Sequence, residues 1–232
     1  MLLSTGRFLA TTDADVQTQS EKNVTQAFIT LLLSIALTTG VATQAAEPDC
    51  TKPNKCKALE LHNQVRKDLN AGRFPNSPKP NPPVAMLTYD KALARTAYNW
   101  SASQCNARPG HNSKRREHFV ANGGNPAYAS VGENIFYSSA HLSEQDALAQ
   151  AVAGWAGEAQ QYRYGPFNDL KTGHYSQLIW DSMDAVDAEG RKLPRAVGCG
   201  VYYCPKGNFR TIVTCNYAPA GNIYQHLPYR AN

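Results

Sequence analysis

Two histidines and two glutamates, in four separate segments of the chain, are the residues best suited to chemistry. They are His62, Glu133, Glu158 and His174. Neutral imidazoles are good ligands for Zn²⁺ and similar divalent cations, and carboxylates can orient the imidazoles or hold a metal-bound water. Each of the four lies beside apolar or aromatic residues, so folding could bring them together in a cleft that holds a metal ion.

The clearest of these segments is residues 173–180, with the sequence GHYSQLIW, which joins an imidazole, two hydroxyls and an amide to an apolar run. A segment with one polar and one apolar side suits the wall of a cavity. If the cleft were catalytic, Ser176 would join the four residues above as a candidate. The chain has no HExxH helix and no GxSxG turn. We therefore expect a binding protein rather than an enzyme.

Two alternatives remain open for these residues. The first is a secreted metal-dependent hydrolase or protease that uses the same cleft. The second is a purely structural role, in which the imidazoles and carboxylates form a buried polar network whose members satisfy one another. Such a network is plausible because a buried polar group without a partner is costly.

Hydrophobic periodicity predicts the helices that must position these residues. Residues 57–69 carry apolar side chains at helical spacing and place His62 on the apolar face. A second helix should begin after Asp90 as its N-cap, and a third after Ser143. The third helix would place Glu158 on its buried side.

Strands and loops account for the rest of the expected domain. Residues 131–137 are typical of a turn that enters a short strand, and residues 106–128 are polar, glycine-rich and typical of a long surface loop. Residues 185–194 form a charged insertion. Residues 196–203 and 209–217 predict two strands joined as a hairpin.

The first 46 residues resemble a targeting segment rather than part of the fold. Residues 1–21 are polar and indicate disorder or an extension ahead of the true start. Residues 22–46 combine a charged start, a short apolar run and small residues at the end, which predicts a signal peptide or, alternatively, an uncleaved anchor. Residues 47–232 would then form one domain. We expect a secreted, extracellular protein, or a periplasmic one if its source is bacterial.

Composition limits the classes of partner that the protein could bind. The chain has 232 residues with 42% hydrophobic content, enough for one compact core, and a net charge of +5. Its longest basic run, residues 114–116, has no interleaved aromatic side chains, which argues against binding of nucleic acid. The apolar run before residue 46 is short, so we expect no stable membrane span after signal cleavage. The six cysteines of an exported chain predict three disulfides.

Four motifs, in this order, give the chain a resemblance to a known family. They are HNQVR at residues 62–66, GENI at 132–135, GHYSQLIW at 173–180 and CNYAPAGN at 215–222. Together they resemble the CAP superfamily of cysteine-rich secretory proteins, antigen 5 and pathogenesis-related 1 proteins, whose domain is also called the SCP domain. The resemblance covers about residues 58–229.

The resemblance implies an α+β fold, a three-layer α-β-α sandwich with a surface cleft that holds a His/Glu tetrad. By similarity the tetrad falls on His62, Glu133, Glu158 and His174, with His62 and His174 binding a weakly held divalent metal, most simply Zn²⁺. The disulfides implied are Cys50–Cys56, Cys105–Cys204 and Cys199–Cys215. Members of the family are linked to lipid and sterol binding, defence and host interaction. We therefore expect an unidentified lipid, sterol or protein ligand. We also expect the protein to be a monomer.

Overall fold

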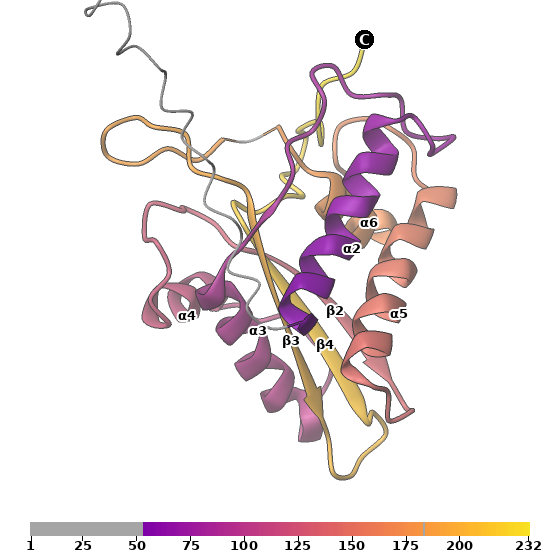
Figure 1. The fold of residues 1–232 in the computed structure, drawn as a ribbon, viewed down its shortest axis with the longest axis vertical. Coiled ribbons are helices and arrows are strands. Elements are labelled where there is room, and N and C mark those ends of the chain that lie inside the picture. The colour runs from indigo at the N-terminus through magenta and orange to yellow at the C-terminus, as the bar shows by residue number, and fades with distance from the viewer. Residues whose placement is uncertain (1–52, 183) are drawn as a thin grey trace, which may run out of the picture. The chain divides into compact units, whose positions relative to one another are not determined.

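The computed structural model describes residues 53–182 and 184–232 of the chain (Figure 1). The predicted extension and signal segment lie outside these residues. Cys50 lies outside them as well, so the Cys50–Cys56 disulfide stays a prediction.

A single four-stranded sheet forms the middle of the domain. Its strands are β1 (Thr88–Tyr89), β2 (Gly132–Ser138), β3 (Ala196–Tyr203) and β4 (Thr211–Ala218), in the order β1-β3-β4-β2. β3 and β4 form the predicted antiparallel hairpin, and β2 pairs antiparallel with the other side of β4. β1 pairs parallel with the start of β3 through only two residues, too few to produce a recognisable alternation in the sequence.

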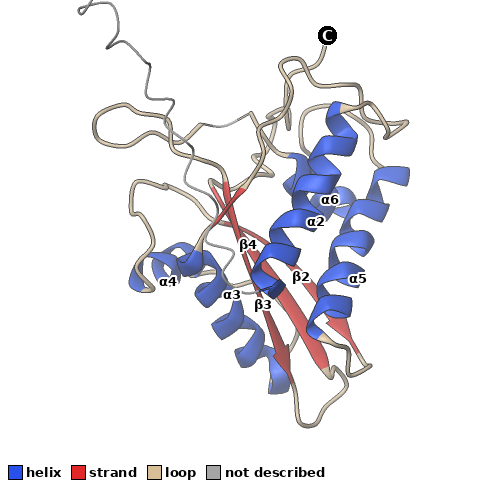
Figure 2. Ribbon diagram, viewed as in Figure 1, coloured by secondary structure: helices blue, strands red, loops and turns tan. Residues whose placement is uncertain are grey.

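Helices cover both faces of this sheet. α2 (Pro53–Asn70), α5 (Glu144–Gly157) and α6 (Gly173–Ile179) lie on one face, and α3 (Lys91–Ser103) and α4 (Arg115–Ala121) lie on the other (Figures 1 and 2). Three short 3-10 turns follow or precede them: η1 (Gln104–Asn106), η2 (Glu158–Gln160) and η3 (Leu170–Thr172). The fold is therefore the three-layer α-β-α sandwich that the resemblance implied.

The two predicted helix starts are confirmed. The Asp90 carboxylate accepts a hydrogen bond of 2.8 Å from the Leu93 amide at the start of α3. The Ser143 hydroxyl accepts one of 3.1 Å from the Asp146 amide at the start of α5. Both side chains satisfy amides that the first turn of a helix leaves without a partner.

The prediction of an uninterrupted loop over residues 106–128 is wrong, because α4 lies within it. Phe119 is the one buried residue of α4, and its ring packs against Tyr128 with centroids 6.1 Å apart. A single apolar anchor gives no periodic signal in seven residues. Tertiary packing of that one ring stabilises the helix instead.

Glycines let α3 approach the sheet closely. A Cβ atom at Gly198 or Gly200 of β3 would meet backbone atoms of α3, at Ala94 and Tyr98 respectively. Glycine inside a strand commonly marks such an approach of another backbone.

Two disulfides cross-link the β3–β4 hairpin and the segment beside it. Cys199 and Cys215 are direct register partners on β3 and β4, with Cα atoms 4.1 Å apart. Cys105, in η1, is joined to Cys204, which follows β3, so this bond ties the end of the α3 segment to the sheet. Both pairs are those implied by the resemblance.

Candidate functional site

His174 and Glu158 form a carboxylate–imidazole pair between α6 and η2. Nδ1 of His174 lies 2.6 Å from Oε1 of Glu158, and the Tyr175 amide donates to Oε2 at 3.0 Å. Because a carboxylate accepts, Nδ1 carries the proton and the neutral ring keeps its lone pair on Nε2. The side chain of His174 is 36% exposed, and its ring stacks on Trp155 at a centroid distance of 6.1 Å.

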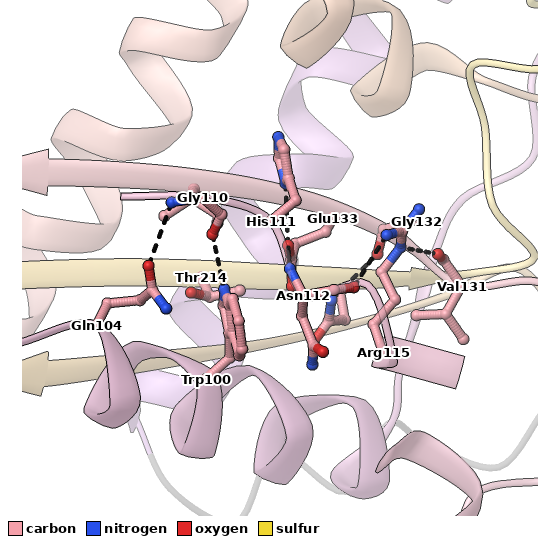
Figure 3. Close-up of polar contacts among 12 residues, drawn as sticks. Trp100, Gln104, Gly110, His111, Asn112, Arg115, Val131, Gly132, Glu133 and Thr214 are labelled. Atoms are coloured by element: carbon pink, nitrogen blue, oxygen red, sulfur yellow. Dashed lines mark hydrogen bonds and ion pairs between the residues drawn. The ribbon is translucent and has the colours of Figure 1, made fainter. Parts of the chain in front are cut away.

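A second pair of the same kind joins His111 to Glu133 (Figure 3). Nδ1 of His111 lies 2.9 Å from Oε1 of Glu133, which also accepts from the Asn112 amide at 2.9 Å. The side-chain amide of Asn216 donates to Oε2 at 3.2 Å. The Glu133 side chain is 1% exposed whereas that of His111 is 58% exposed, so a buried carboxylate holds an accessible ring.

His62, by contrast, is a core residue. It is fully buried on α2, with Nδ1 2.7 Å from the Ala58 carbonyl and Nε2 2.9 Å from the Tyr217 hydroxyl. A carbonyl can only accept, so Nδ1 donates to it and Nε2 accepts from Tyr217. Burial lowers the pKa of His62 to about 4, which keeps its ring neutral.

The structure thus departs from the expected tetrad at one position. Glu158 and His174 are brought together, but the imidazole beside Glu133 is that of His111 and not that of His62. The physical reason is that α2 turns His62 into the apolar layer between itself and the sheet, where both ring nitrogens are already hydrogen-bonded.

Sequence patterns alone do not single out His111 as a site residue. It lies in the long polar loop before α4, where no periodicity marks which side chains point inward. The one available signal was general: functional residues are concentrated on loops held by a rigid scaffold. Here that scaffold is β2, which supplies Glu133.

Strand β2 connects the two pairs. Glu133 faces the α3 side of the sheet, because its register partner Asn216 and the Asn112 loop lie there. Asn134, the next residue, faces the opposite side, and its side-chain amide donates a hydrogen bond of 3.1 Å to the backbone carbonyl of His174. β2 is an edge strand of the sheet, and no further strand of the described residues covers its outer edge. The loop that carries His111 and the helix that carries His174 contact β2 from opposite faces.

Ser176 does not have the surroundings of a nucleophile. Its hydroxyl is 2.6 Å from the Asn222 side-chain oxygen and 3.2 Å from the Gly173 carbonyl, both acceptors. An activated serine needs a base that accepts its proton. In the described residues the contacts of Ser176 include no imidazole.

Each of the two accessible imidazoles could supply one nitrogen ligand to a divalent cation. In each pair the carboxylate fixes Nδ1–H and leaves the Nε2 lone pair available, which is the usual outer-shell arrangement around a metal-ligating histidine. Among the described residues, His62, Cys199 and Cys215 form a group whose possible metal-ligand atoms lie within 4.8 Å of one another. Those two cysteines are joined to each other, so that cluster cannot supply thiolates.

Comparison with known proteins identifies the family of this chain. The model of the cysteine-rich secretory protein family, CAP, matches residues 59–186. The chain belongs to this family. It is 32% identical over 180 residues to venom allergen 5 of Vespa magnifica, covering 75% of this chain and 70% of that protein. It is 30% identical over 203 residues to salivary antigen-5 of Triatoma infestans, covering 78% and 73% respectively.

Solved structures agree on the CAP fold. BmVAL-1 superposes with a TM-score of 0.59 at 20% identity, covering 81% of this chain and 86% of that one. Na-ASP-1 gives a TM-score of 0.57 at 24% identity, covering 78% and 42%. Within residues 53–182 and 184–232, no helix is long and apolar enough to cross a membrane.

Proposed function

We propose that this CAP protein is an extracellular, non-enzymatic binding protein that holds a divalent cation, most simply Zn²⁺, through His111 and His174. The observation that supports this is the pair of matched carboxylate contacts, His111–Glu133 and His174–Glu158, each of which directs an Nε2 lone pair away from its carboxylate. The resemblance named His62 as the first ligand. We favour His111 because its ring is accessible and, among the described residues, only its Nδ1 is hydrogen-bonded.

Two imidazoles leave other coordination positions open. The bound ion should therefore be exchangeable and able to accept water or a group from a ligand, which suits a binding role rather than a closed structural zinc site. We also propose that the protein binds a further ligand, which is a lipid, a sterol or another protein. Relatives named as a venom allergen and a salivary antigen favour a role in defence or host interaction.

Zinc titration calorimetry on the purified protein tests the cation site. His111→Ala and His174→Ala should each weaken zinc binding at least tenfold, while His226→Ala, which removes an exposed histidine outside both pairs, should not. His62→Gln separates the two ligand sets, because it keeps one donor and one acceptor but cannot replace an imidazole nitrogen on zinc. Loss of zinc binding in His62→Gln, with zinc binding unaffected in His111→Ala, would assign the first ligand to His62, as the resemblance implied.

The pH dependence gives a second check on the same site. A histidine must be neutral to bind a metal, so zinc affinity should fall as the solution is acidified. Unchanged zinc uptake in the double variant His111→Ala/His174→Ala would mean that the two pairs are a structural network and not the metal site.

Export is tested independently of the metal. The predicted signal segment implies a mature N-terminus near Ala46 or Glu47, and sequencing of secreted protein would check it. A soluble intracellular product that retains residues 1–45 would contradict the extracellular assignment.

A further inference from the structure

The outer edge of β3 is open over most of its length. β1 pairs with β3 only at Ala196 and Val197, and the chain then leaves the sheet at Asp90 to enter α3. In the described residues no other strand lies beside β3 on that side. Open strand edges are templates for pairing with another segment, and proteins usually cover or blunt them.

The hydrogen-bond pattern identifies which backbone groups are available. The carbonyls of Arg195 and Val197 accept from the Thr88 and Asp90 amides, so these odd-numbered residues point away from β4. Because direction alternates along a strand, the amide and carbonyl groups of Cys199, Val201 and Tyr203 point the same way. Three donors and three acceptors therefore line the open edge.

A groove lies along this edge. Its volume is about 730 Å³, and its lining includes Arg95 and Tyr98 from α3 and Val201, Tyr202 and Tyr203 from β3. This volume falls within the range of known ligand pockets, about 300–1,000 Å³. Tyr98 and Tyr202 pack edge to face with ring centroids 5.6 Å apart, and Tyr98 remains 47% exposed.

The charge of the groove favours an acidic occupant. Its charged side chains are Lys91, Arg95 and Glu144, an excess of one positive charge. Arg95 is exposed, and within the described part of the chain it forms no ion pair. A second copy of the chain would bring the same cations toward each other across a two-fold axis, which opposes self-pairing.

We propose that the β3 edge is a second binding site, distinct from the His/Glu pairs, that takes an extended acidic peptide segment of a partner protein by strand addition. The peptide backbone would pair with Cys199, Val201 and Tyr203, and one of its carboxylates would lie near Arg95. Main-chain hydrogen bonds give affinity in this mode of recognition, and alternate side chains give specificity.

The test uses the full-length protein and a fluorescein-labelled hexapeptide of alternating valine and glutamate, followed by fluorescence anisotropy. Two control peptides isolate the contributions: one methylated at every backbone nitrogen, and one with lysine in place of glutamate. The methylated peptide has no amide donors and should bind at least tenfold more weakly. The lysine peptide should bind about five- to tenfold more weakly, as expected for exchanging an exposed ion pair for a like-charge contact.

Protein variants locate the site. Tyr203→Pro removes an amide that faces the open edge without touching the β3–β4 ladder, and it should abolish binding, whereas Tyr203→Ala keeps that amide and should retain most of it. Arg95→Glu should reverse the preference, so that the lysine peptide binds better than the glutamate peptide. Arg95 is exposed, so this variant keeps the test valid if the proline variant does not fold.

Amide hydrogen exchange supplies a direct reading of the edge. Addition of the glutamate peptide should slow exchange at Val201 and Tyr203. Equal binding of the methylated peptide, protection confined to other segments, or no binding at millimolar peptide would overturn the proposal. A concentration-dependent dimer that protects the same amides would assign the edge to a second copy instead.

Discussion

Acid should destabilise this protein through His62. Burial lowers the pKa of the folded imidazole to about 4, whereas the same group in the unfolded chain has its ordinary value of 6.5. Between these two values the unfolded chain binds a proton that the native protein does not, so stability rises with pH across this window. The contribution is complete above about pH 6.5, is lost progressively as pH falls, and is gone below about pH 4.

The size of the effect follows from the difference in pKa. Each pKa unit corresponds to about 1.4 kcal/mol, so the free energy of unfolding should fall by about 3 kcal/mol from this residue alone. That is a large part of the stability of a typical domain, about 5–15 kcal/mol. The main structural cause is burial, because a charged ring would lie in the core without access to water. It would keep its hydrogen bond to the Ala58 carbonyl, but its Nε2 could no longer accept from the Tyr217 hydroxyl.

Urea unfolding monitored by tryptophan fluorescence, at intervals from pH 7.5 to pH 4.5, measures this contribution. Carboxylates also titrate near the lower end, so the informative quantity is the difference between the wild type and His62→Gln. Glutamine can donate to Ala58 and accept from Tyr217 but does not titrate. The wild-type advantage should therefore shrink by about 2–3 kcal/mol over this range.

A constant difference between the two proteins across the whole pH range would refute the reasoning. It would mean that His62 is solvated in the native state or already charged at neutral pH. His226→Ala, which alters an exposed histidine, should follow the wild type at every pH and so controls for the loss of an imidazole as such.

Two further predictions concern the sheet. Replacing Cys199 and Cys215 together by serine should lower the free energy of unfolding by about 3 kcal/mol, as expected for a loop with a sequence separation of 16, and calorimetry with peptide mapping would check both the loss and the pairing. Gly200→Ala should destabilise the protein, because the added methyl group would meet the backbone of Tyr98. Gly154→Ala, at an exposed helical position with open space, should instead stabilise it by about 0.5–1 kcal/mol. Equal melting temperatures of the two variants would contradict the close packing of α3 on β3.

Sequence periodicity was sufficient for the elements that bury a continuous apolar face. The helices that begin at Lys91 and Glu144 and the β3–β4 hairpin were predictable because a repeat of apolar residues matches each of them. α4 and β1 were missed for a common reason. Each depends on contacts outside the element itself: α4 on the packing of Phe119 against Tyr128, and β1 on its pairing with two residues of β3.

The candidate site was only partly predictable for a related reason. His62 and His111 are both histidines next to asparagine, and local sequence does not say which of them faces a carboxylate. His62 carried the clearer signal, since it lies on an amphipathic helix. That signal indicated burial, and burial is what the structure gives it, with both ring nitrogens occupied. The apolar face that made His62 conspicuous is therefore also what removes it from the accessible site.

The dipeptide Glu133-Asn134 shows why the site needs a strand at its centre. Successive side chains of a strand point to opposite faces, so one residue can hold His111 from the α3 side while the next holds the backbone of His174 from the other. A slip of one residue in the pairing of β2 with β4 would exchange the two faces and lose both contacts. The Asn216–Glu133 hydrogen bond opposes such a slip, because it joins direct register partners across the two strands. The polar residues of β2 therefore fix the register of the sheet edge and, through it, the positions of both imidazoles.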